Sequence, residues 1–346
     1  MYNSDYDHSK KAGNEGDVIK HVFLLNRIDD LIRESKDVAE PFWYIDSHSA
    51  RPYHRLHPQG KWTHGIGKLH KTADTAPELL AEYLSFCFYE EDLPRLSKTA
   101  FTGMGARLYL GSSALVSRRF SKLASKQDFQ MTLFDIDANV CDSLFEYYKS
   151  KFIHPLVLRP DGYQPEIAKQ LSSIWKALDS NRQLIIAASC YDYFEKLMDQ
   201  QGDTVPSFVF IDPHRLGKER EEIQSILASC KNMRSPFLCW TPLTSVMIKG
   251  LSNASWSWEQ NEKEDEIKFN TFCKNNDFRI AWFGWGSVSG ASQNTYGCQL
   301  VFDSEYSISE LKEKCNLIQS ACNGAGIHVK NGEFRVRCWP DQKDKE

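Results

Sequence analysis

Phe208-Val209-Phe210-Ile211-Asp212-Pro213-His214-Arg215 joins four apolar residues to an Asp-Pro pair. A short apolar run that ends in turn-forming residues is typical of a strand buried on both faces. A parallel sheet binds its ligands beyond the carboxyl ends of its strands, and that is where this strand would place the carboxylate of Asp212. The segment therefore predicts a central strand with Asp212 in an active site.

Similar apolar runs recur along the chain and alternate with helical patterns, which predicts an α/β protein with a mainly parallel sheet. The expected strands are 42–45, 131–134, 184–188, 208–211, 237–240, 280–283 and 298–302. Asp46 and Asp135 directly follow two of these runs, as Asp212 follows a third. The three carboxylates are therefore expected at one edge of the sheet.

Two regions depart from this alternation. Residues 51–106 carry a helical, histidine-rich pattern without an apolar strand run, so we expect an inserted helical subdomain there. Residues 1–50 and 107–346 would then form the sheet-containing domain. Residues 252–267 combine two tryptophans with several acidic residues, and we expect an exposed excursion.

The composition fits a globular protein with an ample core, since 41% of the 346 residues are hydrophobic and 25% are charged. No apolar run approaches the roughly 20 residues that cross a membrane, and the first residues lack the pattern of a signal peptide. None of the ten cysteines falls in a Cys-x-x-Cys pair. We therefore expect a cytoplasmic protein with reduced cysteines, no metal site and no membrane contact.

The charge is unevenly distributed, although the net charge is only −4. From Ser47 to Ala73 there is no acidic residue, while five lysines or arginines and five histidines accumulate. This pattern is compatible with phosphate binding and equally with an ordinary solvated face.

The N-terminal helix has a recognisable start. Asn14 is placed to cap it and Asp17 follows three residues later, while Val18, Val22, Leu25 and Ile32 recur at helical spacing. Lys20 and His21 lie one turn beyond Asp17. By itself this trio would be interpreted as a charged group on the helix surface.

The residues from Tyr6 to His21 match a longer pattern. They read Tyr-x-His-Ser-x-x-Ala-Gly-Asn-x-x-Asp-Val-x-Lys-His, with ten fixed positions in order, and this motif closely resembles the N-terminal motif of the bacterial large-subunit rRNA adenine-N6 methyltransferase family (RlmJ). The similarity continues through later matching segments: 44–48, 65–66, 111–112, Asp135, Asp212-Pro213 and Trp240-x-Pro242. It spans most of the chain.

The resemblance implies a class I methyltransferase fold, with a seven-stranded, mostly parallel, Rossmann-like sheet and an inserted helical subdomain. It also implies S-adenosyl-L-methionine as the methyl donor, an adenine of large-subunit rRNA as the acceptor, and a monomer or weak dimer. Carried over residue by residue, Asp212 is the catalytic acid, and Tyr6, His214 and Arg215 fall at substrate-binding positions. The cofactor-binding positions implied are Lys20, His21, His48, Ser112, Asp135, Asp161 and Gly162.

Two of these assignments have an alternative. Asp135 could accept hydrogen bonds from both ribose hydroxyls of the donor, and the alternative, that it caps the helix expected at Ala138–Tyr148, is compatible with this role. Two residues are candidates for the acid that contacts the donor's adenine. Asp161 is favoured because Asp161-Gly162-Tyr163-Gln164 matches the family's sequence at this point. Asp192 is the alternative because it follows 184–188, which is the clearer third strand.

Two departures from the family pattern bear on activity. The family's glycine-rich turn after the first strand is replaced by Ser49-Ala50-Arg51-Pro52-Tyr53, which predicts a reshaped or weakened donor pocket. The family's Asp-Pro-Pro-Tyr motif reads Asp212-Pro213-His214-Arg215, so a guanidinium stands where an aromatic ring would stack on the base. The alternatives to an RNA adenine methyltransferase are an inactive RNA- or cofactor-binding relative and a methyltransferase with a different acceptor.

Overall fold

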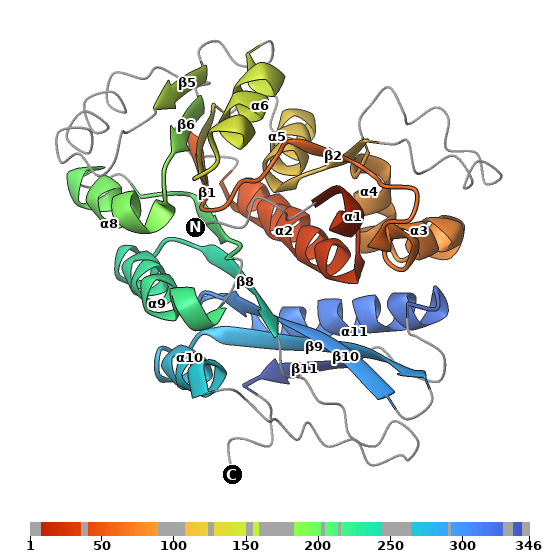
Figure 1. The fold of residues 1–346 in the computed structure, drawn as a ribbon. Coiled ribbons are helices and arrows are strands. Elements are labelled where there is room, and N and C mark those ends of the chain that lie inside the picture. Colours follow the sequence, from red (N-terminus) through yellow and green to blue (C-terminus); the bar gives the residue numbers. More distant parts are fainter. Residues whose placement is uncertain are drawn as a thin grey trace.

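The computed structural model describes residues 8–35, 41–88, 108–123, 128–149, 155–158, 183–201, 205–213, 216–243, 264–289, 292–327 and 335–340. Its main sheet has nine strands in the order β11-β9-β10-β8-β7-β1-β4-β6-β5 (Figure 1). Their bounds are Phe42–Asp46 (β1), Phe129–Asp135 (β4), Pro155–Leu158 (β5), Gln183–Ala187 (β6), Phe208–Ile211 (β7), Phe237–Leu243 (β8), Arg279–Ser289 (β9), Ser292–Phe302 (β10) and Arg335–Trp339 (β11).

All seven strands expected from the sequence are present. Strands β5, β6, β4, β1, β7 and β8 run parallel to one another, whereas β10 is antiparallel to β8 and β9, and β11 is antiparallel to β9. The expected count of seven was wrong, because β5 and β11 extend the sheet at its two outer edges. Both are short, and an edge strand needs no long apolar run.

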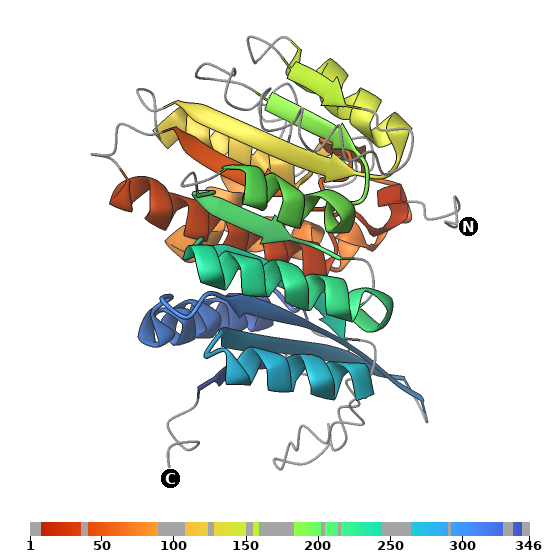
Figure 2. The ribbon, with the colours of Figure 1, turned by 90° about the vertical axis from the view of Figure 1, so that its left-hand side faces the viewer.

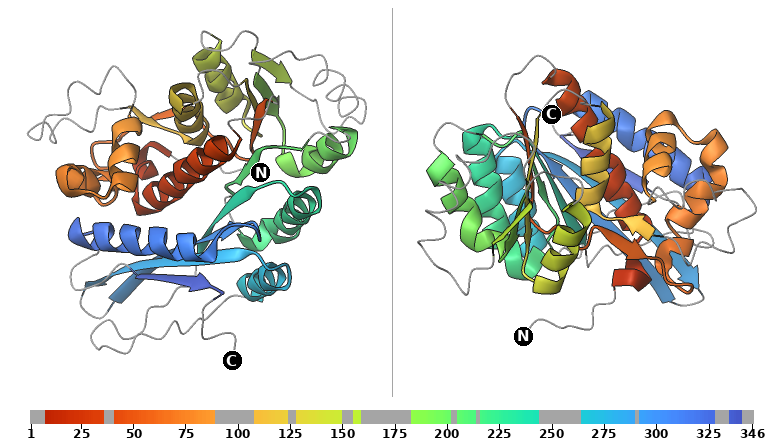
Figure 3. Two further views of the ribbon diagram at one scale, coloured as in Figure 1. Left: turned by 180° about the vertical axis from the view of Figure 1, so that it is seen from behind. Right: turned by 90° about the horizontal axis from the view of Figure 1, so that it is seen from above.

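Helices cover both faces of the sheet (Figures 1 and 3). One face packs on α2 (Glu15–Glu34), α4 (Glu78–Phe86), α5 (Ser112–Leu123), α6 (Ala138–Tyr148) and α11 (Ile308–Gly324). The other packs on α8 (Cys190–Gln201), α9 (Leu216–Met233) and α10 (Glu264–Asn275), which lie side by side in Figure 2.

The central strands alternate between these two cores. Phe208 and Phe210 of β7 belong to the first core, and Val209 and Ile211 belong to the second. Successive side chains of a strand point to opposite faces, so a strand covered on both sides must be apolar throughout. This explains the continuous apolar run that precedes Asp212.

The start of α2 is fixed by the expected cap and by a close chain crossing. The side chain of Asn14 accepts a hydrogen bond from the backbone of Asp17 at 2.9 Å, and Asp17 accepts one from Gly13 at 3.0 Å. Gly13 has a φ of 74°, and the backbone of Ile66 donates to its carbonyl at 2.9 Å. A Cβ on Gly65 would lie 2.4 Å from that same oxygen, so only glycine permits the crossing. Lys20 and His21 lie one turn further along α2, so the same contacts fix where they lie.

Residues 51–106, which were expected to be helical and to contain no strand, contain a strand. In a separate two-stranded sheet, β2 (Tyr53–Arg55) pairs antiparallel with β3 (Leu108–Leu110). Between β2 and α4 lie three short helices, η1 (Lys61–Thr63), α3 (Ile66–Leu69) and η2 (His70–Thr75). The absence of strands was therefore a wrong expectation, because three-residue strands leave no periodic signal. The boundaries of the inserted subdomain remain a prediction.

Three further features bear on the expectations from the sequence. All ten cysteines are buried and free of disulfides. Glu264–Ile267 begins α10, so the expected excursion was wrong for these residues; Glu266 is buried, whereas Glu264 and Ile267 are exposed as expected, and 252–263 lie outside the described residues. Within the described ranges, no helix has both the length and the apolar composition of a membrane span, and no cluster of three potential metal-binding side chains occurs.

Candidate active site

Three aspartates stand at the carboxyl ends of adjacent central strands. Asp46 ends β1, Asp135 ends β4, and Asp212 directly follows β7. Because β1 pairs in parallel with both β4 and β7, the three ends lie at one edge of the sheet. The start of α2 brings Lys20 to the same edge, where it contacts Asp212. This is the place where open parallel sheets bind ligands.

Lys20 lies between two carboxylates. Its Nζ donates to Asp212 Oδ2 at 2.7 Å and lies 3.2 Å from Asp17 Oδ1. Burial alone would lower the pKa of Lys20, but the charges of Asp212 and Asp17 raise it above the ordinary value. Lys20 is only 8% exposed, so the interpretation as a surface charge trio was wrong. The ammonium group stays charged and orients the carboxylate of Asp212.

Asp46 is fully buried and organises the end of β1. Its carboxylate accepts hydrogen bonds from Ser112 Oγ at 2.7 Å, Tyr44 Oη at 3.1 Å and the backbone of His48 at 3.2 Å. Burial raises the pKa of Asp46 to about 7, with the bond from Ser112 opposing the rise and the charge of Asp212 adding to it. A carboxyl group that titrates near neutral pH thus holds two predicted cofactor-binding residues, Ser112 and His48.

His21 is packed behind this edge. One ring nitrogen is 2.8 Å from the hydroxyl of Tyr109 in β3, which in turn is 2.6 Å from the hydroxyl of Tyr83. Burial and, after it, the charge of Lys20 lower the pKa of His21 to about 3. His21 is therefore neutral at physiological pH, and it connects α2 to the small sheet.

His48 follows β1 and is partly exposed. Its Nδ1 is 2.6 Å from Ser47 Oγ, and its Nε2 is 3.9 Å from the thiol of Cys190 at the start of α8. The ring also packs edge-on against Tyr191. His48 therefore lies between the ends of β1 and β6.

Asp135 is held by backbone donors on both sides. Its Oδ1 accepts from Asp137 at 2.8 Å and its Oδ2 accepts from Ala50 at 3.2 Å. The alternative role of Asp135 as a helix cap was wrong, because the side chain of Asp137 caps α6. The carboxylate remains partly exposed in a fixed orientation, as a group that receives ribose hydroxyls must be.

The turn after β1 adopts a conformation that favours glycine. Ala50 has a φ of 51°, in the left-handed region that costs a residue with a Cβ about 1–2 kcal/mol. This is the turn in which the resemblance implies glycines. The turn therefore has a backbone conformation that favours glycine, although its sequence contains none.

Not every predicted site residue can be placed. Tyr6, Asp161, Gly162, His214 and Arg215 lie outside the described residues. Asp192 lies in the first turn of α8 and is exposed. The strand before α8, β6, is the neighbour of β4, whereas β5, which precedes Asp161, lies one strand further out. The strand that precedes Asp192 is thus the direct neighbour of β4, as the alternative assignment of Asp192 requires.

Three residues that contribute to the site were not among the predicted catalytic, cofactor-binding or substrate-binding residues. Asp46 holds Ser112, Asp17 contacts Lys20, and Tyr109 contacts His21. The first had a signal in the sequence, since an aspartate directly follows the apolar run of β1. For Tyr109 no signal existed, because its strand has only three residues.

This arrangement defines the class to which the fold belongs. A mostly parallel sheet covered on both faces, with β1 at its centre and acidic residues at the strand ends, is the Rossmann-like methyltransferase fold. In the crystal structure of protein LPL1258 from Legionella pneumophila str. Philadelphia 1, of the DUF519 family, the same fold covers 96% of this chain and 99% of that one, with a TM-score of 0.61 and 17% identity.

The sequence comparison is narrower. The chain is 31% identical over 117 residues to ribosomal RNA large subunit methyltransferase J of Haemophilus influenzae, a match that covers 32% of this chain and only 37% of that protein. No protein-family model matches. The resemblance to the large-subunit rRNA methyltransferase J family is thus confirmed, over about a third of the chain.

Replacing Ala50 by glycine should stabilise the protein by about 0.5–1 kcal/mol, because the strain of a left-handed residue with a Cβ is relieved. Ala321→Gly, in the last turn of α11, should instead destabilise it by up to about 1 kcal/mol. Urea denaturation of the two variants measures both effects. If both substitutions destabilise equally, the conformation assigned to the turn is wrong.

Asp46 should make stability depend on pH. Its pKa in the folded protein, about 7, lies above the ordinary value of 3.8, so the stability it contributes is fully present below about pH 4 and is lost as the pH rises through 7. Between these limits the wild type should lose up to about 4 kcal/mol relative to Asp46→Asn. Denaturation midpoints from pH 4 to 8 test this. A wild-type profile parallel to that of Asp46→Asn would contradict it, and the exposed substitution Glu221→Gln serves as the control.

Proposed function

We propose that the chain is an S-adenosyl-L-methionine-dependent methyltransferase that transfers a methyl group to N6 of an adenine in RNA, with large-subunit rRNA in the cytoplasm as its substrate. The observation that carries this proposal is the carboxylate of Asp212, which follows β7 at the ligand-binding edge of the fold and is oriented by Lys20 at 2.7 Å. The similarity to a large-subunit rRNA methyltransferase supports RNA as the acceptor class.

The side chains at this edge suit the proposed donor. Asp135 presents a partly exposed carboxylate of fixed orientation for ribose hydroxyls. Ser112 donates its proton to Asp46, so its hydroxyl oxygen can accept a hydrogen bond from a ligand. The partly exposed His48 closes the space between β1 and β6. Bound there, the donor would supply an electrophilic methyl group on a sulfonium.

Asp212 and Pro213 would act on the acceptor. The carboxylate of Asp212 and the backbone carbonyl of Pro213 can each accept a hydrogen bond from the exocyclic amine of adenine, which directs the nitrogen lone pair toward the methyl group. The contact with Lys20 keeps one carboxylate oxygen in place during this approach. No metal takes part in this proposal.

A second candidate is a protein of the same fold that binds RNA or the cofactor without catalysis. It is favoured by the sequence Asp212-Pro213-His214-Arg215, in which arginine replaces the stacking ring, and by the strained turn at Ala50. A methyltransferase with another acceptor is the third. The two measurements below separate these possibilities.

Donor binding should be visible as stabilisation. A ligand that binds only the folded state at about 100 times its Kd adds about 2.7 kcal/mol to the free energy of unfolding. S-adenosyl-L-methionine and its demethylated product should therefore both raise the Tm, and Asp135→Asn should reduce the increase. An unchanged Tm at saturating concentrations of both ligands would refute the proposed cofactor.

Asp212→Asn should abolish transfer while leaving donor binding intact. Loss of the carboxylate that positions the amine is expected to lower transfer from labelled donor to total rRNA at least about 100-fold. Asp277→Asn makes the same chemical change at an exposed position beyond α10 and should have no effect. Equal transfer by both variants would remove Asp212 from the mechanism, and label in protein-free small molecules instead of RNA would identify another acceptor.

A further inference from the structure

Strand β2 presents an Arg-Tyr-Arg stripe to solvent. Tyr53 and Arg55 are exposed on one side of the strand, and between them His54 points inward and is 8% exposed. Arg51, two residues before Tyr53, is exposed as well. The spacing is that of successive residues on one face of a strand, and Arg51 and Arg55 are at most about 13 Å apart along the chain.

The two arginines have no carboxylate partner among the described residues. Arg51 donates to Ser143 Oγ at 3.2 Å, and the side chain of Arg55 makes no hydrogen bond or ion pair within the described ranges. Other arginines of the molecule do pair with acids, as Arg119 does with Asp29 and Arg220 with Asp265. The stripe therefore presents two charges that no carboxylate of the described part of the chain neutralises.

Tyr53 is held in a defined position between them. Tyr53 is 41% exposed, and its ring packs against Tyr147 of α6, with centroids 6.0 Å apart and an interplanar angle of 61°. An exposed aromatic ring of fixed orientation is a platform on which a nucleobase can stack.

More positive charge gathers beside the stripe. Lys61 belongs to η1, which contacts the short helix that contains Lys11. Lys11 belongs to α1 (His8–Lys11), which packs on β2 and on η1. Like charges held together in this way favour a polyanionic partner.

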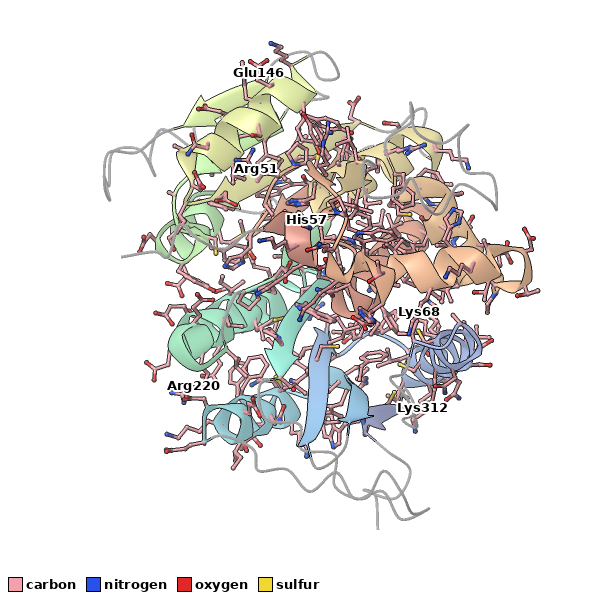
Figure 4. All side chains as sticks on the ribbon, turned by 45° about the vertical axis from the view of Figure 1, so that its right-hand side comes forward. Arg51, His57, Lys68, Glu146, Arg220 and Lys312 are labelled. Atoms are coloured by element: carbon pink, nitrogen blue, oxygen red, sulfur yellow. The ribbon has the colours of Figure 1, made fainter. Side chains whose placement is uncertain are left out.

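The stripe adjoins the candidate active site. The chain that leads into β2 bonds Asp135 through the backbone of Ala50, and on the inner side His54 pairs with Tyr109, the partner of His21. In Figure 4, Arg51 lies between Glu146 of α6 and His57, well away from Arg220 and Lys312.

From these contacts we infer that Arg51, Tyr53 and Arg55 form a docking strip for single-stranded RNA beside the target adenine. The arginines would bind successive backbone phosphates, and Tyr53 would stack on a base. Guanidinium groups and an aromatic ring on one strand face match the alternation of phosphates and bases in an unpaired strand. The inference rests on the proposed function only in taking RNA as the partner.

The test measures the binding of the full chain to a fluorescently labelled, adenine-containing single-stranded RNA across a salt series. Arg51→Ala with Arg55→Ala should weaken binding about 10-fold or more at low salt and reduce the slope of log affinity against log salt by about 1.4, since each phosphate contact on a single strand contributes about 0.7. Arg51→Lys with Arg55→Lys should retain most of the slope. Arg33→Ala with Arg234→Ala removes two exposed arginines elsewhere and should change neither quantity.

The stacking role of Tyr53 has its own comparison. Tyr53→Ala should weaken binding at least about 5-fold, whereas Tyr53→Phe should bind like the wild type, because stacking needs the ring and not the hydroxyl. The Tm of each variant checks that the fold is intact. Equal losses for Phe and Ala would overturn the stacking role.

The outcomes separate this inference from the proposed function. If the variant with Arg51→Ala and Arg55→Ala binds RNA with the wild-type affinity and slope, the docking strip is refuted whether or not the protein transfers methyl groups. If the wild type transfers no methyl group but its RNA binding depends on Arg51, Tyr53 and Arg55, the strip stands and the proposed catalysis fails. Equally tight, strip-dependent binding of polyglutamate would show a general polyanion surface and overturn RNA as the partner.

Discussion

The ion pair between Lys20 and Asp212 joins the first long helix to the central sheet at the point where the chemistry is proposed. It connects residues 192 positions apart and is largely buried, so its two charges are compensated mainly by each other and by Asp17. Removing one member of such a pair leaves an uncompensated charge in a medium of low polarity, which costs more than the pair itself contributes. The position of α2, the orientation of the carboxylate and the closed chain crossing at Gly13 are therefore one linked arrangement.

Around this pair the groups at the sheet edge are kept in different charge states by their surroundings. Lys20 remains charged, His21 is neutral, and Asp46 titrates near neutrality because it is buried and faces the charge of Asp212. Groups with pKa values shifted in this way concentrate at functional sites, although ion-pair networks that serve only structure can shift them too. Here they surround the ligand-binding edge of the sheet, and that location supports a functional role.

The main features of the fold could be predicted from the sequence because they depend on local pattern. The apolar runs of β1, β4 and β7 needed only burial on both faces, and the cap of Asn14 on α2 needed only a spacing of three residues. The pairing of β2 with β3 could not be predicted, since each strand has three residues and their partnership is long-range. The contact between Lys20 and Asp212 and the φ of Ala50 likewise follow from tertiary packing, which no local spacing encodes.

The crossing of Gly13 and Gly65 has a consequence for how the protein is made. The segment before α2 is enclosed by a stretch that the ribosome delivers some fifty residues later, and Asp212 emerges nearly two hundred residues after Lys20. During synthesis the N-terminal helix must therefore wait without its partner Asp212, with only Asp17 of the same helix beside Lys20, because domains with such distant pairings form slowly and expose apolar surface until they close. Chaperone assistance to the nascent chain would matter most in that interval, before the last of the site's carboxylates has left the exit tunnel.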